Sequence, residues 1–224
     1  MSAACIIPHV DPLADAPLRL EIAKEYDPLV LQFLVNGMRE QPIAFAQSQK
    51  TVFIHPDLYT SGLPDSIQEL HGLCRLHAKA TQKRNTSSLR PLLCQKFADL
   101  YRQLSHAATF EELLGCSQAL ILIKAMIILG EDDDQTPYSE AVSYILAGIA
   151  GRLWHQAPIQ LPQNLSPRHA WILAESVRRT IIMAFLLRSV YSLKTRKYSV
   201  RTPFVDALPF DVRTYLWDEG TEQT

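Results

Sequence analysis

Apolar side chains recur at intervals of three and four residues along most of the chain, the spacing expected of α-helices that bury one face. Polar or proline-containing stretches separate these segments, and the alternation typical of strands is absent. The pattern therefore predicts an all-α fold, a single irregular bundle of about six or seven helices. The predicted helical segments are residues 18–40, 64–80, 89–105, 109–130, 138–155 and 166–193.

Local signals refine the ends of these segments. Pro28 should divide residues 18–40 into a short helix and a longer one that ends near Asn36 and Gly37. Ser88 is a candidate cap for the helix after it, and Pro64 fits the first turn of another. Residues 51–56 are rich in β-branched and aromatic side chains, but no second strand is available to pair with them. We expect an extended loop that packs on helices.

The segment 109–130 is apolar on nearly every side, which predicts a central, buried helix. It starts at Thr109 with acidic residues in the first turn, where the helix dipole favours them. The clearest helix start of all is Ser166 followed by Pro167, a cap residue and a proline at the first helical position.

The same pattern suggests the domain organisation. Residues 1–17 hold three prolines and no regular period, and we expect a loose lead-in there. Residues 18–219 are predicted to form one all-α domain, and residues 220–224 a polar tail. The absence of alternating strands and helices disfavours Rossmann and barrel enzymes.

Composition narrows the range of functions. Lysine and arginine total 22 and aspartate and glutamate 23, so no global positive field attracts nucleic acid or anionic lipid. The four cysteines are scattered, which indicates free thiols in a reducing compartment rather than a zinc module. The longest apolar stretch, residues 119–129, is too short to span a membrane and contains Lys124. The N-terminus does not resemble a secretory signal.

Motifs for chemistry are also missing. The seven histidines form no metal-binding spacing, and no nucleotide-binding glycine loop or nucleophile elbow occurs. The acidic run at residues 131–134 lacks the helical aspartate pattern of diphosphate-binding enzymes, and we interpret it as a solvated loop. We therefore predict no catalytic residue, no cofactor and no metal.

Two basic groups remain. Glu175 lies three and four residues before Arg178 and Arg179 on an otherwise apolar helix, which suggests a partly buried ion pair that ties the helix to a neighbour. A looser basic cluster at residues 194–201 suits a solvated helix end.

Four ordered segments of the chain resemble the regulatory region of fungal binuclear zinc-cluster transcription factors. They are Val52-Phe53-Ile54-His55-Pro56-Asp57-Leu58-Tyr59 with Gly62-Leu63-Pro64; Glu111-Glu112-Leu113-Leu114 with Gln118-Ala119-Leu120; Trp171-Ile172, Glu175-Ser176-Val177-Arg178-Arg179-Thr180 and Val190-Tyr191-Ser192; and Leu208-Pro209 with Leu216-Trp217-Asp218.

The resemblance implies an all-α regulatory domain in the nucleus, or alternatively the cytoplasm. In that family a zinc cluster of six cysteines contacts DNA, whereas this chain has four cysteines in all. Either the zinc module is missing from the protein or it lies outside this chain, so we expect no direct DNA binding by these residues. The short apolar stretches lead us to expect no membrane association. The expected partner is a protein, either a full-length transcription factor or a second copy of the chain, with a small hydrophobic effector as a further ligand. The resemblance also implies a link to fungal secondary-metabolite gene clusters.

Two other hypotheses stay open. The helical shell could serve as an enzyme or carrier for a hydrophobic metabolite, with His55, Glu175 and Arg178 as polar groups of a pocket. Alternatively, the chain is a truncated gene product without a role of its own.

Overall fold

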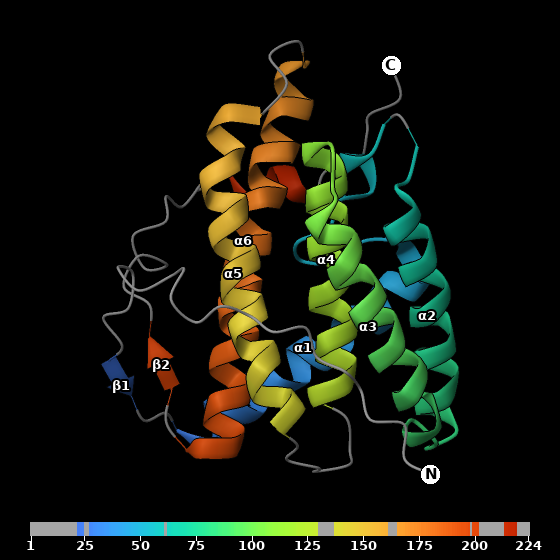
Figure 1. Cartoon of the computed structure of the whole chain (residues 1–224), viewed down its shortest axis with the longest axis vertical. Coiled ribbons are helices and arrows are strands. Elements are labelled where there is room, and N and C mark those ends of the chain that lie inside the picture. Colours follow the sequence, from blue (N-terminus) through green and yellow to red (C-terminus); the bar gives the residue numbers. More distant parts are fainter. Residues whose placement is uncertain are drawn as a thin grey trace.

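The computed structural model describes residues 22–24, 27–60, 62–129, 137–160, 165–197, 199–201 and 213–218, and within these it confirms the all-α prediction (Figure 1). The predicted lead-in and tail, residues 1–17 and 220–224, lie outside these residues, as does the acidic run 131–134. The described α-helices are α1 (Pro28–Ser48), α2 (Asp65–Gln82), α3 (Arg90–Ser105), α4 (Phe110–Ile128), α5 (Pro137–Gln160) and α6 (Pro167–Arg196). Short 3-10 helices are η2 (Pro56–Leu58), η3 (Ser87–Leu89) and η4 (Thr214–Trp217).

Helix α4 is the centre of the bundle, as its apolar sequence predicted. Every residue from Leu113 to Leu129 is buried, and α4 packs against each of the other five α-helices. Its N-terminus is fixed by a capping box, in which Thr109 Oγ1 accepts from the Glu112 N–H at 3.1 Å and Glu112 Oε2 accepts from the Thr109 N–H at 3.3 Å. Side chains on α4 therefore contact all the other α-helices of the described bundle.

Helices α5 and α6 run side by side along one flank of α4 (Figure 1). Ser166 caps α6 as predicted, since its Oγ accepts from the His169 N–H at 3.3 Å. The helix continues to Arg196, three residues beyond the predicted end, and stops where Lys197 adopts a left-handed conformation (φ 67°). Helix α5 likewise extends past the predicted end near Ala157 and Pro158, to Gln160.

The structure corrects the prediction for residues 18–40. Instead of a short helix before Pro28, the described part is the strand β1 (Ile22–Lys24), which pairs antiparallel with β2 (Ser199–Arg201). A partner about 180 residues away along the chain left no signal in the local pattern. Helix α1 also does not end near Gly37, because Met38, Pro42 and Phe45 continue the buried face. Pro42 is tolerated inside the helix, and the Gln41 side chain donates to the Gly37 carbonyl at 2.9 Å.

Two predicted helix starts are also shifted. Pro64 stands at the cap position before α2 rather than in its first turn. Ser88 does not cap α3: it lies in η3, its hydroxyl donates to the Asn85 carbonyl at 3.1 Å, and α3 begins at Arg90. The bond from Ser88 to Asn85 is a local hydrogen bond that competes with the expected cap.

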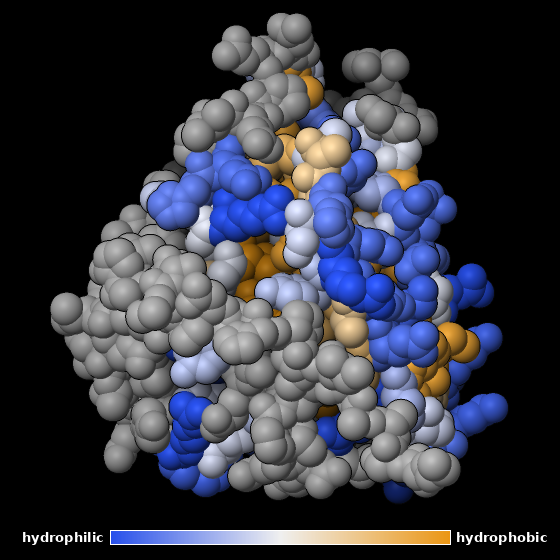
Figure 2. All heavy atoms as spheres, viewed as in Figure 1, coloured by the Kyte–Doolittle hydropathy of each residue, from blue (hydrophilic) through white to orange (hydrophobic). Residues whose placement is uncertain are grey.

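Polar and apolar side chains are distributed as this packing requires. Figure 2 shows hydrophilic side chains over the α2–α3 side of the molecule. Residues 51–55 form a loop that packs against the helices, as predicted, but the loop bends at Val52 and Phe53 instead of being extended. Among exposed apolar side chains, Leu29 and Phe33 on α1 stand out, with 79% and 75% of their surface accessible.

Candidate functional site

The loop at residues 51–59 passes through the middle of the fold and is held by polar contacts. Thr51 folds it into a tight turn, since its Oγ1 accepts from the N–H groups of Phe53 at 3.1 Å and Ile54 at 2.8 Å. The His55 Nδ1 accepts from the Asp57 N–H at 3.0 Å and so caps η2. Thr51 and His55 are both buried. These contacts satisfy polar groups that have lost water.

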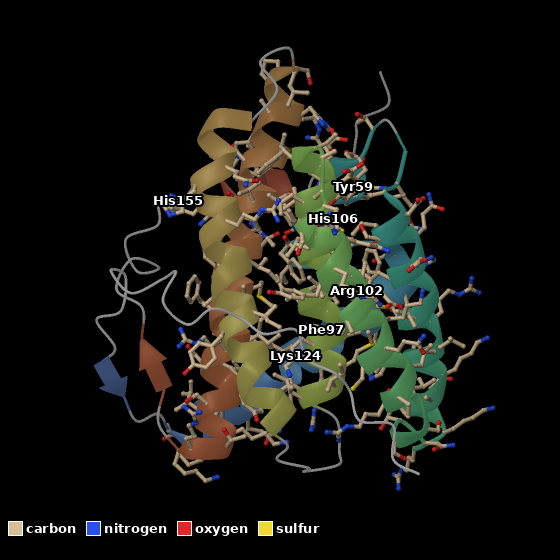
Figure 3. All side chains as sticks on the ribbon, viewed as in Figure 1. Tyr59, Phe97, Arg102, His106, Lys124 and His155 are labelled. Carbon is tan, nitrogen blue, oxygen red and sulfur yellow. The ribbon has the colours of Figure 1, made fainter. Side chains whose placement is uncertain are left out.

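Helix α4 contributes Gln118, a fully buried amide in an otherwise apolar stretch. Its Nε2 donates to the Phe53 carbonyl at 3.1 Å and to the Thr180 hydroxyl at 3.3 Å. Its Oε1 accepts from the Tyr59 hydroxyl at 2.8 Å. The Gln118 side chain thus links the loop, the central helix α4 and α6. Tyr59, the loop residue that donates to it, is labelled in Figure 3.

Helix α6 presents the predicted ion pairs. Arg178 and Arg179 both donate to the Glu175 carboxylate, Arg178 Nε at 2.9 Å and Arg179 Nε at 2.6 Å. Arg179 also donates from Nη1 to the Val52 carbonyl at 2.9 Å. The ion pairs lie within α6, at the spacing that suggested them, and the bond from Arg179 to Val52 ties the helix to the loop.

Trp217 of η4 completes this group. Its indole lies beneath the Arg179 guanidinium, with 4.1 Å between Cζ and the ring centroid, and meets the His55 ring edge to face at 5.0 Å. Its Nε1 donates to the Thr51 carbonyl at 3.3 Å. We call His55, Glu175, Arg178, Arg179 and Trp217 the Trp217 cluster.

Burial and neighbouring charges together set the pKa values of Glu175 and His55. Burial on its own raises the pKa of Glu175, but the hydrogen bonds and charges of Arg178 and Arg179 outweigh it and hold the pKa below its usual value. Burial lowers the pKa of His55, against the raising effect of the Asp57 carboxylate. At neutral pH the cluster therefore contains an ionised Glu175 and an uncharged His55.

Each of the four segments that carry the family resemblance contributes residues to this place. The first supplies the loop 52–59, the second Gln118, the third Glu175 to Thr180, and the fourth Trp217. Residues far apart in the sequence are thus joined here by polar contacts.

Sequence reasoning found part of this network. It singled out His55, Glu175, Arg178 and Arg179, and the structure brings all four together. It missed the contacts of Gln118 and Trp217, although a polar residue within an apolar helix is a signal for a buried polar partner. Whether the four residues act as pocket groups for a metabolite stays a prediction.

A pocket of about 90 Å³ lies elsewhere, between α1, α2 and the C-terminal end of α4. None of the Trp217 cluster lines it. The lining residues are Arg39, Pro42, Ile43, His77, Thr81, Arg84, Thr86, Ala125, Met126 and Leu129.

A second buried charge site is Lys124 on α4, with 1% of its surface exposed (Figure 3). Its Nζ lies 5.8 Å from the centroid of the Tyr191 ring. Burial lowers the pKa of Lys124 to about 7, opposed by Cys94 and assisted by the Arg90 charge. The interior of the bundle therefore holds a lysine that changes its charge close to neutral pH.

The described residues contain neither a membrane-spanning helix nor a cluster of metal-binding side chains. No helix among them combines the length and the hydropathy that crossing a bilayer requires. Within the same residues, no three histidine, cysteine, aspartate or glutamate side chains are grouped as metal ligands would be.

Comparison with known proteins gives one relative. The chain is similar to a protein described as "Transcription factor gsfR2" from Penicillium aethiopicum, with 25% identity over 218 aligned residues. The alignment covers 86% of this chain and 49% of the relative, so the chain spans about half the length of that protein. No family model and no solved structure matches the chain. Over most of its length the chain is thus similar to part of a fungal transcription factor, which supports a regulator-like role.

Proposed function

We propose that the chain is a regulatory domain that acts in the nucleus on transcription of a fungal secondary-metabolite gene cluster. The observation that carries this proposal is the similarity to a fungal transcription factor over 86% of the chain. Contacts among residues of the first, third and fourth resembling segments in the Trp217 cluster support it, and Gln118 of the second segment bonds to the same loop and to Thr180.

DNA recognition in this proposal comes from residues outside this chain. A binuclear zinc cluster requires six cysteines, and this chain has four, spread over residues 5 to 116. In this proposal the regulatory domain associates with a full-length transcription factor or pairs with a second copy of itself. In either case it changes the activity of a DNA-bound complex without contacting bases.

The test uses the full chain with an epitope tag, expressed at its own locus. We expect immunoprecipitation from nuclear extract to recover a zinc-cluster transcription factor or a second, differently tagged copy of the chain. Deletion of the gene should change transcript levels across a biosynthetic cluster before any metabolite changes. Loss of a metabolite with unchanged transcripts would instead favour an enzyme or carrier.

Two complementing variants link the phenotype to the structure. Trp217→Ala removes the indole under Arg179 and should fail to restore transcript levels. Tyr215→Ala changes an aromatic residue of the same short helix that is 58% exposed, and should restore them. Absence of nuclear protein in wild-type cells, or no associated factor, would contradict the proposal.

A further inference from the structure

The pocket between α1, α2 and α4 has two chemically different sides. Five of its lining residues are apolar and come from α1 and the C-terminal end of α4: Pro42, Ile43, Ala125, Met126 and Leu129. The polar residues are contributed by α1, by the C-terminal part of α2 and by the turn after α2: Arg39, His77, Thr81, Arg84 and Thr86. Such a combination suits a small amphipathic molecule rather than a purely apolar one.

Positive charge dominates the polar side. Arg84 is exposed and lies in the turn after α2, where its backbone takes a left-handed conformation (φ 52°) and its N–H donates to the Thr81 carbonyl at 3.1 Å. Arg39 adds a second guanidinium, oriented by a hydrogen bond from its Nε to the Leu129 carbonyl at the end of α4. No carboxylate is among the residues that line the described pocket.

His77 independently indicates that the pocket can accept a polar ligand. The side chain is 8% exposed, and its Nδ1 makes no hydrogen bond within the described structure. Burial lowers the pKa of His77, so the ring is uncharged at neutral pH. An unsatisfied buried polar atom destabilises the fold, and a ligand in the pocket can relieve this by letting the ring reorient and form a hydrogen bond.

From these features we propose that the pocket binds a small monocarboxylic acid with a short apolar body. The carboxylate pairs with the Arg84 guanidinium, whose planar fork matches two carboxylate oxygens, and the apolar body lies against Ile43 and Met126. The pocket is open to solvent on one side, and its volume of about 90 Å³ is below that of a cavity that holds benzene, about 150 Å³, so the body has few carbon atoms or extends out of the pocket.

This site deepens the proposed function, because it gives the regulatory domain an effector of defined chemistry. It does not require that function to be correct. Binding is measured on the purified full chain without any transcriptional readout, so failure of the site and failure of the regulatory proposal are distinguishable.

The experiment compares four probes at pH 7: the four-carbon acid butyrate and three six-carbon molecules, hexanoate, 1-hexanol and hexylamine. Thermal unfolding reports binding, and the carbon-bound proton signals of His77 report its location. We expect saturable stabilisation by the two acids, stronger for hexanoate, with a shift of the His77 signals. Hexylamine tests the opposite charge preference. It is included because four acidic residues follow Gly130 in the sequence, and acidic side chains would favour a cation.

Variants assign the charge contact. Arg84→Gln should weaken hexanoate binding about tenfold or more, the fold-change expected on loss of a charge-assisted hydrogen bond, and Arg84→Lys should recover it in part. Arg75→Gln removes an exposed arginine of α2 that does not line the pocket, and should bind as the wild type does. Equal binding of alcohol and acid, preference for the amine, unchanged binding by Arg84→Gln, or no saturable binding would each overturn the proposal.

Discussion

The Arg179 guanidinium lies over the Trp217 indole at 4.1 Å, although the two residues are 38 positions apart and belong to different elements. The same guanidinium is bound to Glu175 and to the Val52 carbonyl, so it joins the charge of α6 to the loop and to η4. Trp217 is 3% exposed and completes the packing around His55. The contact therefore fastens a C-terminal segment to the bundle.

Removal of the indole should loosen this attachment. We expect Trp217→Ala to lower the free energy of unfolding by about 3 kcal/mol, since a buried aromatic side chain is replaced by a cavity and the Thr51 carbonyl loses its donor. Denaturant titration followed by circular dichroism measures the change. Tyr215→Ala, at an exposed position of the same helix, should stay within about 0.5 kcal/mol of the wild type. Equal losses in the two variants would show that Trp217 does not anchor the segment.

The Glu175 carboxylate should stabilise the fold because it neutralises the charges of Arg178 and Arg179 on α6. Its side chain is 4% exposed and those of Arg178 and Arg179 are 14% and 19% exposed. Glu175→Gln leaves two poorly solvated cations without their anion, and we expect a loss of about 3 kcal/mol at pH 7. The exposed pair Glu69–Lys96 supplies the control, since Glu69→Gln should cost less than about 1 kcal/mol.

The pH dependence of this loss has a defined direction. The folded pKa of Glu175 lies below its ordinary value of 4.5, so the folded protein binds fewer protons there than the unfolded chain. The stabilisation is complete above pH 4.5 and disappears as pH falls through the folded pKa. The difference in the free energy of unfolding between wild type and Glu175→Gln should therefore become smaller at acidic pH. A gap that stays constant from pH 7 to below pH 4 would contradict the ion-pair assignment.

Much of the bundle could be predicted because its signals are local. Thr109 and Ser166 are cap residues followed by helical periodicity, and both cap as expected. The charge pair Glu175–Arg178 is likewise a neighbour relationship within one helix. The β1–β2 pairing and the Trp217–Arg179 contact could not be predicted in the same way. Each joins residues distant in the sequence, and neither leaves a period or a spacing in the chain.

Gln118 is the intermediate case, since its polarity marks it within an apolar helix but its partners are non-local. We expect Gln118→Met to cost about 2 kcal/mol, because the Phe53 carbonyl and the Tyr59 hydroxyl lose their partner in the interior. Adding Tyr59→Phe should cost less in the Gln118→Met background than in the wild type. A double-mutant cycle by denaturant unfolding measures this coupling, and strictly additive losses would exclude the Tyr59–Gln118 bond.

Lys124 should weaken the bundle at neutral pH. Its folded pKa is about 7 and its unfolded pKa about 10.5, so between these values the unfolded chain binds more protons and stability rises with pH. From pH 7 to pH 8.5 we expect a gain of about 1.5 kcal/mol from this residue, measured by denaturant unfolding at each pH. The window stops at pH 8.5 because burial also raises the pKa of Cys116, and of Cys74 to about 12, so ionisation of the unfolded thiols opposes the gain at higher pH.

Lys124→Met keeps roughly the length of the side chain and removes the charge. This variant should be more stable than the wild type at pH 7, and its free energy of unfolding should not increase from pH 7 to pH 8.5 as that of the wild type does. Lys96→Met, at a partly exposed position on α3, should retain the rise. If Lys124→Met showed the same increase with pH as the wild type, the titrating group would be another residue. A loss of stability in Lys124→Met at pH 7 would mean that contacts of the ammonium group outweigh its burial.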